Sequence, residues 1–352
     1  MTNKTLPRLK DVANEANVSL SAASRILRGD SERFGKDTCK RVVAAAQKLG
    51  WRRNLLVSGM QSGRTNTIGV MIPPYDSFWT AVLSGIHETL SEADCLPITV
   101  WIGDAQAFPE LDQPNEVGIK QISRLLDRRV DGLILWPPFG TAYYRHFREF
   151  VERKLPVAVI DFESSDDEIA DSIETDEQQG ASIVASHLLD LGHRRIACFS
   201  TAETTWQPWA VRRREHFEKA VTDGGAECKS WRSGPDQAKA VAIAKEMLTE
   251  YQPTAVFSIT DHEAMPVYEA CRQLGMSIPD DLSIIGFADL DFAAALTPPL
   301  TTVRQKPWQK GVQAAQLVLD RINGKLKSKK AVTIRVDTEL VVRGSTTRNG
   351  AS

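Results

Sequence analysis

A short stretch near the amino terminus, SLSAASRIL, presents an outward face that could recognise another molecule. Apolar side chains at helical spacing predict an inward face made of Ala23, Ile26 and Leu27. The opposite face carries Leu20, Ser21 and Arg25, where a solvated helix normally carries long charged side chains. Leucine offers apolar contact, a hydroxyl donates and accepts hydrogen bonds, and a guanidinium presents a planar fork of donors.

A second set of chemical groups follows the apolar segments of the chain, where strands are expected to end. These positions hold aromatic rings and carboxylates: Phe78, Trp79, Trp136, Asp161, Asp261 and Asp289. Parallel α/β domains bind ligands at the carboxyl ends of their strands. Rings suit the C–H faces of a sugar, and carboxylates accept from its hydroxyls, so the set predicts a polyol site. The alternatives are core packing for the rings and helix capping for the carboxylates.

Three short helices are expected to position the first set. The first spans about residues 9–16, and Asn17 then suits a sharp turn because asparagine tolerates positive φ. Ser19 is a natural N-cap for the second helix, which is expected to run to Gly29. The third, about residues 36–49, is expected to bury Val42, Val43 and Ala46.

A longer α/β region is expected to position the second set. From Thr67 onward, about ten short apolar segments such as TIGVMIPP, VDGLILWPP and LSIIGFAD alternate with helical stretches. This alternation predicts doubly wound parallel sheets, with enough strands for two of them.

The charge distribution separates the same two regions. Residues 1–66 hold 13 Lys/Arg and 5 Asp/Glu, a net charge of +8, whereas the remainder holds 30 and 40, a net charge of −10. A small basic region on an acidic body predicts that the basic part meets a polyanion. The alternative is a basic surface that only confers solubility.

Composition and motifs argue against other classes. Hydrophobic content of 42% and charged content of 25% are typical of a soluble protein, and no apolar run approaches a membrane span. The start has no signal-peptide pattern, and five scattered cysteines without a CxxC pair suit reduced thiols in the cytoplasm. No nucleophile elbow, Walker loop or HExxH motif occurs, so we expect no enzyme, cofactor or metal site.

Several blocks in order give the chain a resemblance to a known family. They are LKDVANEANVSLSAASRIL, VVAAAQKLGW, GRTNTIGV, VDGLIL, LGHRRIA, VFSITDHEAM, IPDDLSIIGFAD and PPLTTVRQ. Together they resemble the LacI/GalR (lactose/galactose repressor) family of bacterial transcription regulators. The resemblance implies a helix-turn-helix, a hinge helix and a two-lobed core of the periplasmic sugar-binding-protein type. It also implies a homodimer on a palindromic double-stranded DNA operator.

The resemblance also implies domain boundaries. The helix-turn-helix domain covers 1–53, the hinge 54–66 and the effector-binding and dimerisation core 67–344. Within the core, the first lobe is expected at about 67–162 plus 304–330, and the second at about 163–303 plus 331–344. Residues 345–352 are expected to form a disordered tail.

For DNA binding, the resemblance assigns base reading to the second helix. Leu20 and Ser21 match the family's variable base-reading positions, and Arg25 matches its recognition arginine, which can bind guanine through two hydrogen bonds. Ser19 and Ser24 suit phosphate contacts. In the hinge, Asn54 matches the family, whereas Met60 stands where a leucine usually wedges into the minor groove. The alternatives are a salt bridge or phosphate contact for Arg25, a partly buried Leu20 and a plain linker for 54–66.

For the effector, the resemblance is less regular. Arg213 matches the family's pocket arginine, Asp161 the carboxylate after the fourth strand, and Asp261 the second residue of an Asn-Asp pair whose first is Thr260 here. Ala288 stands where sugar- and purine-binding members carry Asp, and Asp289 follows it. The full candidate set is Phe78, Trp79, Trp136, Asp161, Arg213, Asp261 and Asp289.

The expected function is therefore a repressor of carbohydrate uptake or catabolism genes, controlled by a sugar-like small molecule. A rival within the family is a regulator that responds to a non-sugar ligand or to none, which Ala288 and Thr260 favour. A solute-binding protein sharing the core would need a signal peptide and no basic helix-turn-helix. Effector identity, target genes and the choice between inducer and corepressor stay open.

Overall fold

A computed structural model describes residues 7–52, 63–72, 76–100, 116–136, 149–150, 152–162, 170–200, 208–234, 236–328 and 330–350. The chain divides into two units, Met1–Thr65 and Asn66–Ser352, each with its own hydrophobic core. Among the described residues, no helix combines the length and the hydrophobicity of a membrane span.

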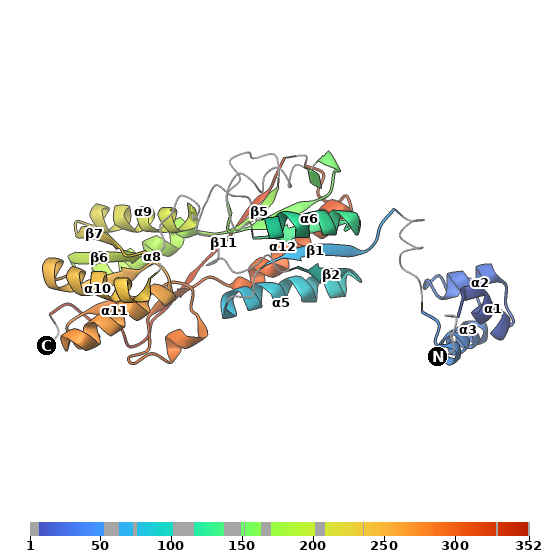
Figure 1. Ribbon diagram of the computed structural model, residues 1–352, viewed down its shortest axis with the longest axis horizontal. Coiled ribbons are helices and arrows are strands. Elements are labelled where there is room, and N and C mark those ends of the chain that lie inside the picture. Colours follow the sequence, from blue (N-terminus) through green and yellow to red (C-terminus); the bar gives the residue numbers. More distant parts are fainter. Residues whose placement is uncertain are drawn as a thin grey trace. The chain divides into compact units, whose positions relative to one another are not determined.

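In residues 7–52 and 63–65, the described part of the first unit, the chain forms three helices, α1 (Leu9–Glu15), α2 (Leu20–Ile26) and α3 (Lys36–Leu49), labelled in Figure 1. Asn17 makes the turn between α1 and α2 at φ +50°, and the Ser19 hydroxyl caps α2 by accepting from the Ala22 amide at 3.1 Å. The helices are confirmed, although α2 ends at Ile26, before Gly29. The expected burial of Val43 was wrong: it is 43% exposed, because the core face of α3 carries Val42, Ala45 and Ala46 instead.

The second unit contains a six-stranded parallel sheet in the order β11-β5-β4-β3-β1-β2. Its strands are β1 (Thr67–Met71), β2 (Leu96–Thr99), β3 (Gly132–Leu135), β4 (Val157–Ile160), β5 (Asp171–Thr175) and β11 (Thr333–Val336). Strands β3, β4 and β5 are buried at every residue, as expected for strands covered on both faces.

Helices cover both faces of this first sheet. One face packs against α5 (Ser77–Glu92) and α12 (Pro307–Ile322), and the other packs against α6 (Glu116–Asp127). Helices α5 and α12 cross closely because glycines stand at the contact. A Cβ at Gly85 would lie 2.2 Å from the Trp308 carbonyl oxygen, and one at Gly311 would lie 2.1 Å from that of Val82.

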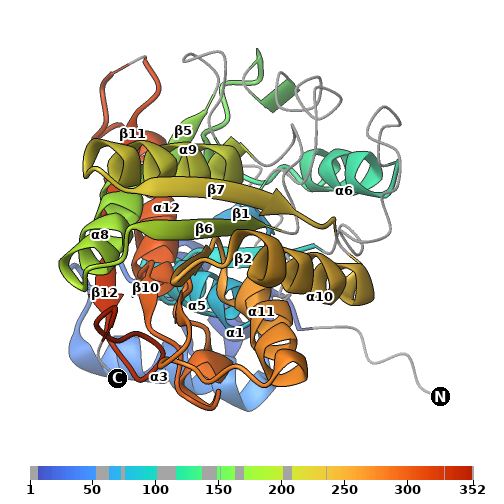
Figure 2. The same cartoon turned by 90° about the vertical axis from the view of Figure 1, so that its left-hand side faces the viewer.

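A second parallel sheet has the order β7-β6-β8-β9. Its strands are β6 (Arg195–Ser200), β7 (Glu227–Arg232), β8 (Ala255–Ser258) and β9 (Ser283–Ile285). Figures 1 and 2 show α8 (Glu177–Asp190) and α9 (Pro208–Asp223) on one side of it. On the other side lie α10 (Gln237–Glu246), with the π-helical turn Met247–Tyr251, and α11 (Asp261–Leu274). The two sheets define two lobes and confirm the doubly wound α/β prediction.

Two short antiparallel strands lie in the segments that connect the two lobes. Strand β10 (Thr302–Arg304), which leads into α12, pairs with β12 (Glu339–Val341), and a short 3-10 helix, Asp291–Ala294, precedes β10. The expected lobe boundaries were wrong for β5 and β11, because both strands, assigned to the second lobe, pair with each other in the first sheet. The first lobe therefore extends to Thr175 and takes up Thr333–Val336.

The carboxyl-terminal residues are ordered up to 350, contrary to the expected tail. The Ser345 side chain is fully buried and donates to the Ile284 carbonyl at 2.6 Å, while its own hydroxyl oxygen accepts from the Thr301 amide. The Thr347 amide donates to Ser283, and the Asn349 amide donates to the Leu191 carbonyl. These hydrogen bonds hold the segment against the second lobe.

Candidate functional site

The outer face of α2 is built as the sequence predicts. Leu20 is 53% exposed, Ser21 and Arg25 are exposed, and Ser24 is half-buried, whereas Ala23 and Ile26 on the other side are buried. The helix is therefore held by its apolar side, and its outer side is available for contact. Asn54 and Met60, the hinge candidates, lie outside the described residues.

The unit that carries this face also exposes many basic side chains. The exposed basic side chains of the described part of the first unit are Arg8, Lys10, Arg25, Arg28, Arg33, Lys36, Lys40, Arg41, Lys48, Arg52 and Arg64. Lys48 pairs with Glu15 of α1 at 2.6 Å, which also raises the pKa of this lysine. Such a surface attracts polyanions, and an exposed helix among basic groups is the usual arrangement of a major-groove reader.

The predicted effector aromatics meet at the carboxyl edge of the first sheet. Trp79, in the first turn of α5, and Trp136, directly after β3, are half-buried, with ring centroids 5.1 Å apart. Phe78 is buried and stands edge-on to Trp79 at 5.0 Å. Asp76 caps α5 by accepting from the Trp79 amide at 3.1 Å, which fixes the start of the helix.

Asp161 lies at the same edge, and a lysine binds it. Lys310 of α12 is fully buried, and its Nζ donates to both Asp161 oxygens, at 2.6 and 2.7 Å, and to the Thr175 hydroxyl. Asp161 also accepts from the Thr175 amide at 3.0 Å, and Thr175 in turn donates to Gln305. The carboxylate predicted to bind a sugar is therefore engaged by groups of its own chain.

Arg213 of α9 is buried in the second lobe, with 2% of its side chain exposed. Its Nε and Nη2 donate to the two carboxylate oxygens of Glu177, at 2.6 and 2.9 Å, and Nη1 donates to the Ile259 carbonyl at 2.7 Å. The centroid of the Phe287 ring lies 3.6 Å from the guanidinium carbon, and that of the Trp209 ring lies 4.8 Å from it. The predicted pocket arginine is thus held by an ion pair and two rings.

Asp261 is fully buried at the start of α11. One carboxylate oxygen accepts from the Thr302 hydroxyl at 2.5 Å, and the other accepts from the Leu290 amide at 2.7 Å. Burial raises the pKa of Asp261 to about 6, against the lowering effect of these two hydrogen bonds. Thr260, not Asp261, caps α11, in a capping box with Glu263. Asp261 therefore anchors the segment after β9.

Asp289 is bound by two arginines. Arg304 of β10 donates to one carboxylate oxygen at 2.7 Å, and Arg343 donates to the other. Ala288 and Asp289 adopt φ of +137° and +59°, a left-handed backbone that is costly for residues with a Cβ. The two ion pairs of Asp289 and a backbone β-bridge between Ala288 and Arg304 hold this conformation. Asp289 therefore ties the turn after β9 to strand β10, which lies where the chain passes between the lobes.

The two lobes touch through this same turn. Leu290, Phe292 and Ala288, which follow β9, pack into the cluster of the first lobe that contains Phe78. His262 of α11 lies 3.5 Å from Asp76 of α5. The lobes are therefore joined across their facing edges in the arrangement described.

Sequence reasoning missed the partners of the charged candidates. Lys310 and Glu177 both lie on helices with an amphipathic pattern, and neither belongs to a motif. The signal that the sequence offers is a charged residue on an otherwise apolar helix face. In α12 the buried residues Gly311, Ala314 and Ala315 form such a face, and Lys310 lies on it.

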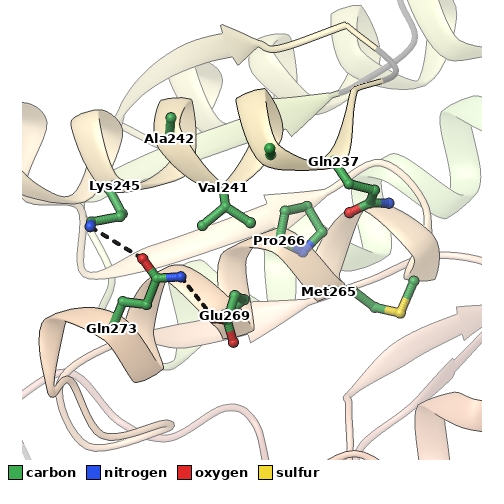
Figure 3. A pocket seen from close by; sticks show the side chains of 9 residues that line it. Gln237, Val241, Ala242, Lys245, Met265, Pro266, Glu269 and Gln273 are labelled. Atoms are coloured by element: carbon green, nitrogen blue, oxygen red, sulfur yellow. Dashed lines mark hydrogen bonds between the residues drawn. The ribbon is translucent and has the colours of Figure 1, made fainter.

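A groove on the outside of the second lobe lies between α10 and α11. Figure 3 shows the two helices facing each other across it, with the hydrogen bonds Lys245–Gln273 and Gln273–Glu269 at one end. Its lining is largely apolar: Ala238, Val241, Ala242, Met265 and Pro266.

Cysteine and metal chemistry find no support in the described residues. Burial raises the pKa of Cys228 and of Cys271 to about 12, so both thiols stay protonated, and burial also raises the pKa of Cys198. Within the parts of the chain that are described, no group of three His, Cys, Asp or Glu side chains is placed to hold a metal ion.

Two sequence families match different parts of the chain. Residues 8–54 match the family of bacterial regulatory proteins, lacI family, and residues 185–346 match the periplasmic binding protein-like domain. The PurR transcriptional repressor of Photobacterium profundum is 27% identical, over 96% of this chain and 98% of its own. Catabolite control protein A of Priestia megaterium is 28% identical, over 89% and 92%.

A solved structure has the same fold. The Lac repressor dimer bound to operator and the anti-inducer ONPF aligns with a TM-score of 0.81 and 21% identity, over 97% of this chain and all of that one. The helix-turn-helix unit, the two-lobed core and the similar repressors agree with one another, and such repressors are not enzymes. The chain belongs to the lacI family of bacterial regulatory proteins, which bind DNA and regulate transcription.

Proposed function

We propose that the protein is a repressor that binds a palindromic operator as a homodimer and responds to a small-molecule effector. The observation that carries the DNA part is the outer face of α2, where Leu20, Ser21 and Arg25 are exposed together. Arg25 binds a guanine edge through two hydrogen bonds, Leu20 contacts a thymine methyl group, and Ser21 adds a weaker hydrogen bond. Ser19 and Ser24 contact phosphates and set the register.

Residues 54–66 connect the two units as a hinge in this proposal, with Asn54 and Met60 reaching the minor groove. An apolar side chain wedged between base pairs there would bend the operator and bring its two halves to the two α2 helices. Gly59 and Gly63 lower the helix propensity of this segment.

The groove between α10 and α11 supports the homodimer. Ala238 and Ala242 are exposed one helical turn apart on α10, beside the half-buried Met265 of α11. Lys245 and Glu269 also line the groove with opposite charges, and Glu269 already accepts from Arg272 of its own helix. A two-fold axis places one copy's apolar groove on the other's and brings Lys245 toward the partner's Glu269, a self-complementary contact.

The effector part rests on the two-lobed core. The similar Lac repressor was solved with an anti-inducer, and the cleft between lobes is the site that such a core offers. A ligand controls DNA binding only through its differential affinity for two lobe arrangements. Carbohydrate uptake or catabolism genes are the proposed targets. A non-sugar effector is the second candidate, favoured by the engagement of Asp161, Arg213, Asp261 and Asp289 within the chain.

A genome-wide map of binding sites in the native host tests the proposal. A few palindromic sites beside uptake and catabolic genes are expected, whereas many dispersed sites would contradict a local repressor. Gel shifts on such a site then compare Arg25→Ala with the control Arg33→Ala. The control removes the same charge at a residue that lies outside α2. We expect Arg25→Ala to lose operator preference, worth about 1–3 kcal/mol, and to keep weak, salt-sensitive binding.

Sedimentation equilibrium tests the dimer. Ala242→Asp places a carboxylate in the apolar groove and is expected to yield monomers, whereas Lys239→Asp on the same helix, outside the groove, is expected to leave dimers intact. A dimeric Ala242→Asp variant would contradict this interface.

A further inference from the structure

The charged side chains expected to bind the effector share one property: their own chain already satisfies them. Asp261 and Asp289 each accept hydrogen bonds at both carboxylate oxygens. Asp161 and Arg213 are held more tightly, because each is paired with a buried residue of opposite charge.

The first pair leaves Lys310 without a spare donor. An ammonium group has three N–H bonds, and Lys310 directs them to the two Asp161 oxygens and to Thr175. The lysine is fully buried, and Asp161 is 11% exposed. The pair carries no net charge, and both oxygens of the Asp161 carboxylate already accept hydrogen bonds from Lys310 and not from a ligand.

The second pair, Arg213 with Glu177, likewise occupies hydrogen-bond donors of the guanidinium. Glu177 takes two parallel hydrogen bonds from the guanidinium, the strongest geometry for this pair, and Ile259 takes a third. Phe287 and Trp209 lie against the guanidinium. A ligand hydroxyl or carboxylate would have to displace Glu177 to reach it.

What remains at the edge of the first lobe is aromatic. Trp79 and Trp136 are half-buried 5.1 Å apart, beside Phe78. Flat rings stack well on such side chains. A buried polyol must find partners for several hydroxyls, and it pays a desolvation penalty for each one left without a partner.

We propose that Lys310 and Glu177 are specificity-determining residues. By occupying Asp161 and Arg213 they exclude polyols and charged sugars, and they leave a site for a neutral ligand with a flat ring, stacked on Trp79 and Trp136. This inference rests on the proposed function, namely that the cleft of the second unit binds an effector.

Calorimetric titration of the full-length protein tests the inference. The flat neutral probes are adenine, cytosine and indole, and the polyol probes are ribose, glucose, cellobiose and glucose 6-phosphate, all at millimolar concentration. We expect heat of binding from at least one flat probe and from no polyol. Trp136→Ala is expected to weaken that binding about tenfold, and Trp136→Phe much less.

Asp161→Asn and Arg213→Lys provide the second arm, with folding checked by thermal unfolding. Because neither side chain contacts the ligand in this inference, we expect affinity for the flat probe to change less than about threefold, well under the effect of one lost charged hydrogen bond. Polyol binding by the wild-type protein would overturn the inference, and its loss in Asp161→Asn or Arg213→Lys would show that these side chains contact the polyol. The absence of any response to the flat probes would overturn it as well. Gel shifts on operator DNA test the repressor function separately and do not depend on these titrations.

Discussion

At the scale of single residues, burial and its compensation decide what a charged group can do. Asp261 is the clearest case, since its carboxylate is buried and faces two neutral donors. Burial raises its pKa from an ordinary 3.8 to about 6, so the folded protein holds a proton that the unfolded chain releases. The contribution of this proton to stability is therefore complete below about pH 4 and is lost as the pH rises from 4 through 6.

The resulting prediction concerns the pH dependence of unfolding. Two pKa units correspond to roughly 3 kcal/mol. Asp261→Asn carries no charge, so we expect its stability relative to the wild type to increase as the pH rises from 4 to 7. Urea unfolding of both proteins across this range measures the difference. A constant difference would show that Asp261 does not titrate in the folded state near pH 6.

The Asp161–Lys310 pair gives a second residue-scale prediction. Lys310→Met leaves the Asp161 carboxylate buried without its cation, a change that typically costs about 3–5 kcal/mol. The double variant Asp161→Asn/Lys310→Met removes both charges and should recover most of this loss. A double-mutant cycle by urea unfolding measures the coupling, and additive effects of the two substitutions would mean that the pair does not interact.

These partners also mark the limit of reading the site from sequence. The types of residue that follow each strand are visible in the chain, and they do gather near the carboxyl edges of the two sheets. The groups that bind them are not visible, because Lys310 is 149 residues from Asp161 and Glu177 is 36 from Arg213. Tertiary packing alone brings each pair together, and it turns presumed ligand contacts into internal ion pairs.

At the scale of elements, the crossing of α5 and α12 depends on two glycines. Alanine in place of Gly85 would gain roughly 1 kcal/mol of helix propensity. Its Cβ would lie 2.2 Å from a backbone carbonyl, which cannot move without separating the helices, and such overpacking typically costs about 1–3 kcal/mol. We therefore expect Gly85→Ala to destabilise the second unit by thermal unfolding. Ser84→Ala, exposed on the same helix, is the control and should be neutral or slightly stabilising.

The carboxyl-terminal segment is the second element with a testable property. His187 contacts the Thr346 hydroxyl and His193 contacts the Thr347 carbonyl, both at 3.0 Å. Burial lowers the pKa of both histidines from an ordinary 6.5, so the fold favours their neutral forms. Their contribution is complete above pH 6.5 and is lost as the pH falls below it.

We therefore expect acid to loosen residues 345–350 before it unfolds the lobes. Hydrogen exchange, expressed as protection factors, should show protection of this segment falling between pH 7 and pH 5. His193→Asn should show weak protection at every pH. Protection that stays constant in the wild-type protein would contradict the role of the histidines.

Element prediction succeeded where a pattern is local and failed where it is not. Apolar runs and alternating helices are local, so the strands and the doubly wound class followed from the sequence. Membership of β5 and β11 in the first sheet is not local, because it depends on hydrogen bonds between segments more than 150 residues apart. The order of the last residues likewise depends on Ser283 and Ile284, which no feature of GSTTRNG indicates.

At the scale of the whole molecule, the two units have separate cores and different tasks. The core of the first unit is formed by its three helices and the segments next to them, and it includes Val12, Ala23 and Val42. The second unit has its own buried clusters on both faces of each sheet. We therefore expect a protein of residues 66–352 to unfold at the same temperature as the second unit does within the full chain.

The same division predicts how operator affinity depends on assembly. The proposed dimer contact lies in the second unit, at α10 and α11, whereas base reading lies on α2. When two linked α2 helices engage two half-sites, the second contact is intramolecular and raises affinity by about 10²–10⁴. Residues 1–65 alone should therefore bind the palindrome at least about a hundredfold more weakly than the full chain. Fluorescence anisotropy on labelled operator measures both, with a single half-site as the control. On a half-site neither protein can engage two α2 helices, so the difference in affinity between residues 1–65 and the full chain should largely vanish. A difference in affinity that persists on the half-site would place DNA contacts outside residues 1–65.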